Sequence, residues 1–296
     1  MSRIRTLLDE ARAGRRLDGE EALALYLEAD LHALGRAAHA VRLAKHPEPV
    51  VTYVVDRNIN YSNICVCACT FCAFYRAPDD PEGYVLSREE LARKVKETIA
   101  LGGTQILMQG GHHPGLGLDF YEDMLRFLKG WPIHIHAFSP PEIVFFAEKE
   151  GLPVAEVIAR LKAAGLDSIP GGGAEILVDE VRGRISPNKC GARAWLGVME
   201  EAHAQGLRTT ATMMFGHMET DEQRIEHLLA VRATQDATGG FTAFIPWTFQ
   251  PGNTALTARK RTAPEYLRML ALSRLVLDNV DNRSEEHTSE LQSLLI

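Results

Sequence analysis

Residues 63–76 read NICVCACTFCAFYR and place Cys65, Cys69 and Cys72 in the spacing C-x3-C-x2-C. This stretch follows an apolar run at residues 50–55, which predicts the first of a series of strands. Three thiolates can hold three irons of a [4Fe–4S] cube and leave the last iron open, whereas zinc sites and electron-transfer clusters usually take four protein ligands. The spacing therefore predicts a reactive iron–sulfur site at the end of a strand.

Strand-like and helical segments alternate along the rest of the chain. Capping boxes at Ser87 and Thr220 each begin a helix, and two more helices are expected at residues 153–164 and 191–205. Residues 3–46 are expected to form two helices. Repeated βα units predict a parallel sheet covered by helices. The remaining predicted strands are residues 105–108, 133–138, 167–169, 209–215 and 241–249.

Polar or glycine-rich segments follow nearly every predicted strand, and this favours a barrel over an open doubly wound sheet, because barrel enzymes collect such segments at one mouth. We predict an α/β TIM-type (β/α) barrel that is incomplete at the C-terminus, with an N-terminal helical extension at residues 1–48 and the barrel core at residues 49–282. Residues 283–293, RSEEHTSELQS, resemble a translated sequencing-library adapter, so residues 283–296 are interpreted as a non-native tail.

Composition narrows the classes of partner and compartment. The 296 residues carry a net charge of −7 and 46% hydrophobic residues, which is ordinary for a globular protein and offers no basic stripe for nucleic acid. No apolar run reaches membrane-spanning length, and the N-terminus lacks the features of a signal peptide. Crowded cysteines do not predict a disulfide framework, so we expect a reducing, cytoplasmic location.

The chain has two further cysteines that could bind a metal, Cys67 and Cys190. Cys67 stands between Cys65 and Cys69 and is expected to point away from the cluster as a small buried thiol. Cys190 lies far off in sequence at the start of a predicted helix, and we expect a structural role for it.

The cysteine loop resembles the signature of the radical S-adenosylmethionine (SAM) enzymes. Seven motifs, in order along the chain, resemble the cyclic dehypoxanthinyl futalosine synthase family, the futalosine-pathway cyclases of menaquinone biosynthesis. The deazaflavin (F0) synthase subunits and aminofutalosine synthase are related alternatives. The motifs are residues 53–63 YVVDRNINYSN, 71–76 FCAFYR, 109–114 QGGHHP, 134–142 HIHAFSPPE, 168–175 SIPGGGAE, 212–217 TMMFGH and 244–252 FIPWTFQPG.

This resemblance implies a ring closure driven by a radical. SAM would bind the open iron, accept an electron from the reduced cluster and yield a 5′-deoxyadenosyl radical. That radical would take hydrogen from the ribose of dehypoxanthine futalosine, and the sugar radical would add to the benzoate ring. The implied partners are this small-molecule substrate and an electron donor such as flavodoxin or ferredoxin, without nucleic acid or membrane.

The resemblance also implies cofactor contacts. Phe71 would lie near the adenine, and Gln109, Gly110 and Gly111 would approach the SAM amino group, since glycine lacks a Cβ. Arg76 would neutralise the cluster or bind a carboxylate, although a surface charge is the alternative.

Glu175, His113 and His217 are the candidate catalytic residues. Glu175 follows three glycines and could bind SAM, and we favour it over Glu142, which is expected to be a solvated turn acid. The rival from another class is a non-enzymatic iron–sulfur or zinc-binding module.

Overall fold

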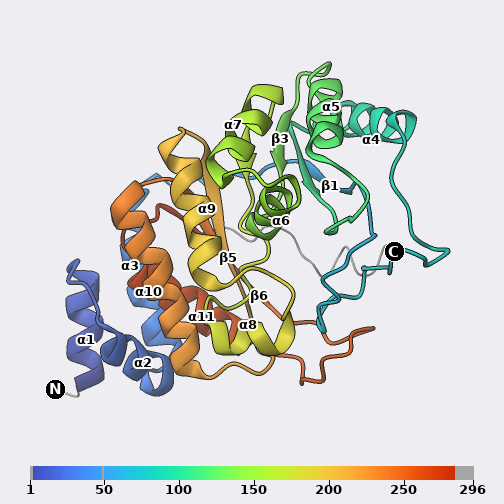
Figure 1. Cartoon of the computed structure of the whole chain (residues 1–296). Coiled ribbons are helices and arrows are strands. Elements are labelled where there is room, and N and C mark those ends of the chain that lie inside the picture. The colour runs from blue at the N-terminus through green and yellow to red at the C-terminus, as the bar shows by residue number, and fades with distance from the viewer. Residues whose placement is uncertain (1–2, 49, 284–296) are drawn as a thin grey trace.

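The computed structural model describes residues 3–48 and 50–283 (Figure 1). The interpretation of residues 283–296 as a tail falls almost entirely outside these ranges. The N-terminal part forms three helices where the sequence predicted two, because Ala29 ends one helix and Asp30 caps the next by accepting a hydrogen bond from the Ala33 amide at 2.9 Å. These helices are α1 Arg3–Arg12, α2 Gly19–Glu28 and α3 Leu31–Lys45.

The strands form one parallel sheet. Their order in the sheet is their order in the chain, from β1 at one edge to β7 at the other. In the described residues it is an open half-barrel, which agrees with the predicted incomplete barrel. The strands are β1 Asp56–Asn60, β2 Gln105–Gln109, β3 His134–Ala137, β4 Ser168–Ile169, β5 Arg208–Phe215, β6 Phe241–Thr248 and β7 Asn282–Arg283.

The prediction of a strand at residues 50–55 is wrong. Sheet pairing begins at Asp56, which lies opposite Gln105 of β2. The preceding segment pairs with no strand in the described part of the chain and is exposed, with Tyr53 86% and Val51 84% accessible. Apolar composition alone therefore misplaced the strand, because the residues that pair are the more polar ones that follow.

The other helices pack outside the sheet, and α5, α7, α9 and α10 follow one another along its outer face (Figure 1). The helices predicted from Ser87, Thr220, residues 153–164 and residues 191–205 are confirmed within a residue or two. Four others were missed. In the described residues, the helices after α3 are α4 Arg88–Ala100, α5 Leu118–Leu128, α6 Pro140–Glu150, α7 Val154–Ala164, α8 Asp179–Ile185, α9 Ala192–Ala204, α10 Asp221–Thr238 and α11 Ala263–Val276.

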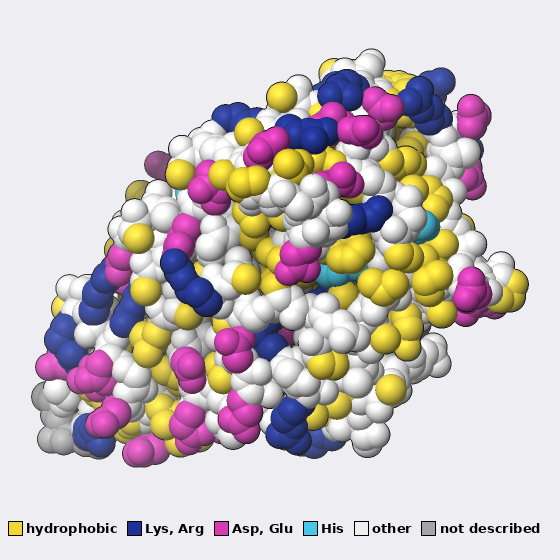
Figure 2. Space-filling model, in the orientation of Figure 1, with side chains coloured by type: hydrophobic (Ala, Val, Ile, Leu, Met, Phe, Trp, Pro, Cys, Tyr) yellow, Lys and Arg dark blue, Asp and Glu magenta, His cyan; other side chains and the backbone are white. Residues whose placement is uncertain are grey.

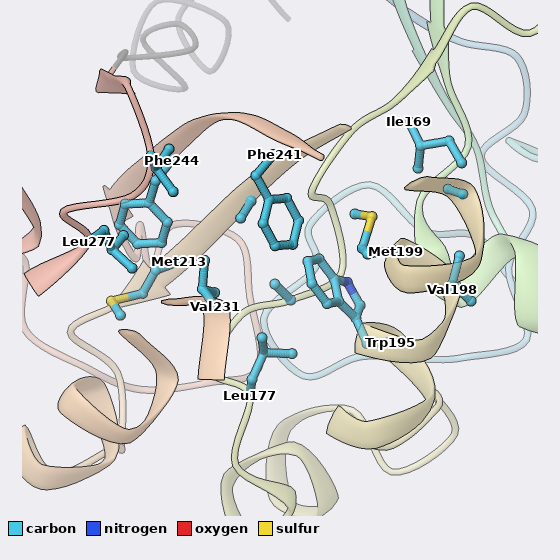
Figure 3. Packing of buried hydrophobic residues seen from close by; sticks show 14 of the residues in the cluster. Ile169, Leu177, Trp195, Val198, Met199, Met213, Val231, Phe241, Phe244 and Leu277 are labelled. Atoms are coloured by element: carbon cyan, nitrogen blue, oxygen red, sulfur yellow. The ribbon is translucent and has the colours of Figure 1, made fainter. Parts of the chain in front are cut away.

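A continuous hydrophobic core joins the sheet to these helices. Figure 3 shows Trp195 and Met199 of α9 beside Phe241 of β6 and Ile169 of β4. The buried Trp195 indole donates a hydrogen bond to the Gly172 carbonyl at 3.1 Å. The core therefore also fixes the glycine-rich segment that follows β4.

The surface of the molecule mixes acidic and basic side chains, as Figure 2 shows. In that view apolar side chains gather on the right, over the region occupied in Figure 1 by the segment after β1. The exposed apolar side chains of this segment, within residues 61–86, are Val66, Phe74, Tyr75, Tyr84 and Val85.

None of the helices in the described part of the chain has the length and apolar character needed to cross a bilayer.

Candidate functional site

A cavity of about 420 Å³ lies where the carboxyl ends of the strands meet. Segments that follow β1, β2, β3, β4 and β6 contribute to its wall, and Met214 contributes from β5. This is the edge at which parallel α/β proteins bind ligands. The three cysteines of the C-x3-C-x2-C motif, Cys65, Cys69 and Cys72, all line this cavity.

Backbone hydrogen bonds close the cysteine segment on itself and hold it to other parts of the chain. The Cys65 amide donates to the Arg76 carbonyl at 2.9 Å, which closes the segment on itself. Between the last two cysteines of the motif, the Thr70 amide donates to Ile185 of α8 at 2.9 Å. The Thr70 carbonyl accepts from the Leu256 amide at 2.9 Å. The loop is thus closed by its own backbone and held at Thr70 by two distant segments.

The surroundings lower the pKa of two of the three cavity thiols. The Cys65 sulfur interacts with the Cys67 thiol and accepts hydrogen bonds from the amides of Cys67 at 3.4 Å and His112 at 3.3 Å. These contacts lower the pKa of Cys65 to about 6. The hydrogen bond from Cys67 also lowers the pKa of Cys69, whereas burial raises the pKa of Cys72. Since the thiolate is the form that binds metal, the donor set suits iron ligation.

Cys67 lies behind the cavity wall rather than in it. Its buried sulfur is 3.0 Å from Nδ1 of His112 and 3.4 Å from the Asn188 carbonyl oxygen. Hydrogen bonds with Cys65 and Cys69 raise the pKa of its thiol, so Cys67 is the neutral member of the group. The predicted distinction between Cys67 and the three cavity cysteines is consistent with this placement.

The glycines after β2 are required by close packing of protein on protein. A Cβ on Gly110 would lie 2.3 Å from the Tyr61 ring, and a Cβ on Gly111 would lie 2.1 Å from the Ile64 carbonyl oxygen. Side chains at these positions would therefore displace the segment that leads into the cysteines. Gln109 lines the cavity beside them, and its side-chain amide lies against Gly172 in the segment that follows β4.

Glu175 sits in the cavity wall with a lysine that the sequence reading missed. Its Oε1 is 3.2 Å from Nζ of Lys189, and its Oε2 is 3.8 Å from Nη1 of Arg182. Lys189 also lies over the Phe71 ring, 5.1 Å from the ring centre. No sequence pattern marked Lys189, because it lies in an irregular segment between α8 and α9.

Glu142 is buried, which corrects its expected role as a solvated turn acid. It is 2% accessible, and its Oε1 accepts hydrogen bonds from the Tyr61 hydroxyl at 2.6 Å and the Gly110 amide at 3.0 Å. Its Oε2 accepts from the Ser139 amide and hydroxyl, each at 2.7 Å. Burial raises the pKa of Glu142. The S-x-x-E spacing from Ser139 was the signal that could have identified this helix start.

Three predicted site residues lie outside the set that lines the cavity. The Arg76 guanidinium is 2.7 Å from Glu82, so its charge is already paired near the surface. His113 accepts a hydrogen bond from the Gly115 amide at 3.0 Å within its own turn. His217 packs against the Met214 carbonyl and Glu219, with Nδ1 3.1 Å from Glu219 Oε2.

Comparison with known proteins places the chain in a family. A model described as the radical SAM superfamily matches residues 59–231, and one described as the CofH/MqnC C-terminal region matches residues 238–288. The cyclic dehypoxanthine futalosine synthase of Streptomyces coelicolor is 48% identical over 94% of this chain and 71% of that protein. The 5-amino-6-(D-ribitylamino)uracil--L-tyrosine 4-hydroxyphenyl transferase of Methanococcoides burtonii is 41% identical over 88% of this chain and 74% of that protein.

Solved structures agree on the fold. Methylornithine synthase (PylB) superposes with a TM-score of 0.72 at 17% identity, over 93% of this chain and 77% of that one. The chain therefore belongs to the radical SAM superfamily, within the group that carries the CofH/MqnC C-terminal region.

Proposed function

We propose that the chain cyclises dehypoxanthine futalosine by radical chemistry, in the futalosine pathway of menaquinone biosynthesis. The observation that carries the proposal is that Cys65, Cys69 and Cys72 line one cavity while Cys67 does not. Similarity to the Streptomyces synthase supports the choice of substrate over the rest of the superfamily.

We assign Cys65, Cys69 and Cys72 as the ligands of a [4Fe–4S] cluster, with one iron left for SAM. When bound, the reduced cluster and SAM supply a carbon-centred radical that abstracts hydrogen from the substrate. The lowered pKa values of Cys65 and Cys69 support this assignment, because a lowered pKa makes it easier for the thiol to lose its proton when it binds iron. An external one-electron donor, such as a flavodoxin or ferredoxin, completes the system.

Five residues of the cavity wall are proposed to hold SAM. Phe71 offers an aromatic face to the adenine, and Gln109 with Gly110 and Gly111 offers backbone groups at the end of β2. Glu175 supplies a carboxylate for the amino or ribose groups. Its backbone is in the left-handed region at φ 42°, a costly conformation for a non-glycine residue that is typical of functional sites.

The remaining wall suits a reactive radical. Phe74, Met214, Trp247 and Phe249 form apolar surface that keeps water from the reacting carbon. Beside them, Asn58, Asn60, Thr248 and Gln250 offer hydrogen-bonding groups for the hydroxyls and carboxylate of the substrate. We place the substrate against this surface.

Glu175 is the proposed catalytic carboxylate, since of the three residues named as catalytic from the sequence it is the one found among the described residues that line the cavity. His113 and His217 were also named, and their catalytic roles remain predictions. A cytoplasmic location is proposed because all five cysteines are free thiols, the state kept in reducing compartments.

The test is an anaerobic assay of the reconstituted, dithionite-reduced chain with SAM and dehypoxanthine futalosine. We expect 5′-deoxyadenosine together with a cyclised product that has lost two hydrogens, measured by mass spectrometry. Formation of 5′-deoxyadenosine without that product removes the cyclase assignment but keeps the radical chemistry. Absence of both leaves a non-enzymatic iron–sulfur protein.

A second substrate pair is tested in the same assay, because the transferase relative is 41% identical. 5-Amino-6-(D-ribitylamino)uracil with L-tyrosine replaces dehypoxanthine futalosine. We expect no adduct of the two compounds, and an adduct would move the chain to the transferase group.

A further inference from the structure

Lys189 is the one lysine or arginine among the described residues that line the cavity. The irregular segment that carries it is held on both sides. The side-chain amide of Asn188 donates to the Cys67 carbonyl at 3.3 Å, and the Arg182 guanidinium donates to the Cys190 carbonyl at 2.7 and 3.1 Å. The lysine is therefore fixed relative to the cysteine loop by its chain neighbours.

The ammonium of Lys189 is confined and stays charged. Its side chain is 15% accessible, lies 3.2 Å from Glu175 Oε1, and stands over the Phe71 ring. Burial acts against the charge, but Glu175 and Cys69 more than offset burial and raise the pKa of Lys189 above its ordinary value. A full positive charge thus sits in the wall of the cavity.

That charge lines the same cavity as the three cysteines Cys65, Cys69 and Cys72. The ammonium stands 5.1 Å from the ring centre of Phe71, the residue that precedes Cys72. A cluster held by three thiolates is anionic and gains a further negative charge when it is reduced. In a poorly solvated pocket, a nearby cation stabilises the reduced state more than the oxidised state.

We propose that Lys189 sets the reduction potential of the cluster, and that Glu175 holds its ammonium in place while partly offsetting its charge. The proposal rests on the cluster ligation proposed above and is independent of which substrate is cyclised. Lys189 is a positioning residue in this account, because it acts on the iron site through space without binding it.

The test is a redox titration of the reconstituted cluster followed by electron paramagnetic resonance, without SAM or substrate. Lys189→Met should shift the midpoint potential to a more negative value, and Lys189→Arg should stay near the parent. Glu175→Gln should shift the potential the opposite way, because it removes a negative charge. The matched control is Lys96→Met, the same change at an exposed position of α4, which should leave the potential unchanged.

The opposite signs separate an electrostatic role from a packing role. The proposal is overturned if Lys189→Met keeps the cluster at the parent potential, or if both substitutions shift it in the same direction. Should Lys189→Met load no cluster, Glu175→Gln decides, and a potential at or below that of the parent contradicts the proposal. Iron and sulfide contents are measured first, so a parent chain without a cube reveals failure of the ligand assignment itself.

Discussion

At the scale of single residues, backbone strain is concentrated around the cavity. Among the described residues, four non-glycine residues have positive φ, and three of them are Ala68 in the cysteine loop at 49°, Phe138 after β3 at 61° and Glu175 after β4 at 42°. Each such conformation costs about 1–3 kcal/mol and persists only where surrounding contacts fix it. Their common location indicates that the conformation of the backbone around the cavity is maintained at a cost in folding stability.

Replacement of Cys67 tests the ligand assignment. Cys67→Ala should keep iron loading, because its sulfur faces His112 and Asn188, whereas Cys69→Ala should lose it. Iron and sulfide analysis after anaerobic reconstitution gives the answer. Loss of iron in Cys67→Ala equal to that in Cys69→Ala would mean that the ligands were chosen wrongly.

At the scale of elements, the end of β2 is clamped onto the cysteine segment. The Gly111 position lies within 2.6 Å of the Cys65 Cβ once a side chain is added, and Gly110 is covered by Tyr61. Glu142 at the start of α6 ties Tyr61 and Gly110 together through Oε1. Three elements thus fix the mouth before any ligand binds.

A methyl group at Gly111 should break this clamp. Gly111→Ala should lose most of its iron loading, because backbone rather than a flexible side chain stands in the way. The control is Gly35→Ala in α3, where a Cβ meets nothing within 4 Å. That control should load iron normally and gain about 0.5–1 kcal/mol in unfolding free energy. Normal iron loading in Gly111→Ala would contradict the clamp.

At the scale of the whole molecule, one buried polar network joins the N-terminal helices to the sheet. Arg224 of α10 contacts Glu219 after β5 at 2.6 Å, and donates to the Tyr26 hydroxyl of α2 at 2.8 Å. Glu219 also accepts from the Gly216 amide at 2.6 Å and lies beside His217. His217, one of the candidate catalytic residues, therefore lies beside a structural connection between distant segments.

The network predicts a component of acid sensitivity. Burial alone would raise the pKa of Glu219, but His217 and Arg224 prevail and lower it below the ordinary value of 4.5. A depressed folded-state pKa adds stability that is present above about pH 4.5 and is lost as the pH falls through the folded-state value. Chemical denaturation at several pH values should therefore show this loss in the parent and a flatter profile in Glu219→Gln.

Magnitude and control complete this prediction. Glu219→Gln should cost roughly 3 kcal/mol near neutral pH, because it removes the buried one of the two carboxylates that Arg224 contacts, Glu219 and the partly exposed Asp221. The control is Glu226→Gln, at an exposed position of α10, the helix that carries Arg224. It should retain the dependence of stability on pH seen in the parent. An unchanged profile in Glu219→Gln would show that other groups govern acid unfolding.

Local signals in the sequence were sufficient for most of the framework. Capping boxes at Ser87 and Thr220 and the apolar runs of β2, β5 and β6 each depend on neighbours a few residues away, so a linear reading finds them. The C-x3-C-x2-C spacing is likewise a local signal, because its three cysteines lie within eight residues. By itself, then, the sequence determined the βα order, the parallel sheet and the place of the iron–sulfur loop at its mouth.

Only the tertiary structure decided which side chains share the cavity. Lys189 and Glu175 are far from Cys65 in sequence, and Glu142 meets Tyr61 across 81 positions. The exposure of residues 50–55 and the exclusion of His113 and His217 from the cavity wall depend equally on how distant segments pack. Such contacts follow from the closure of the chain in space, and no local pattern encodes them.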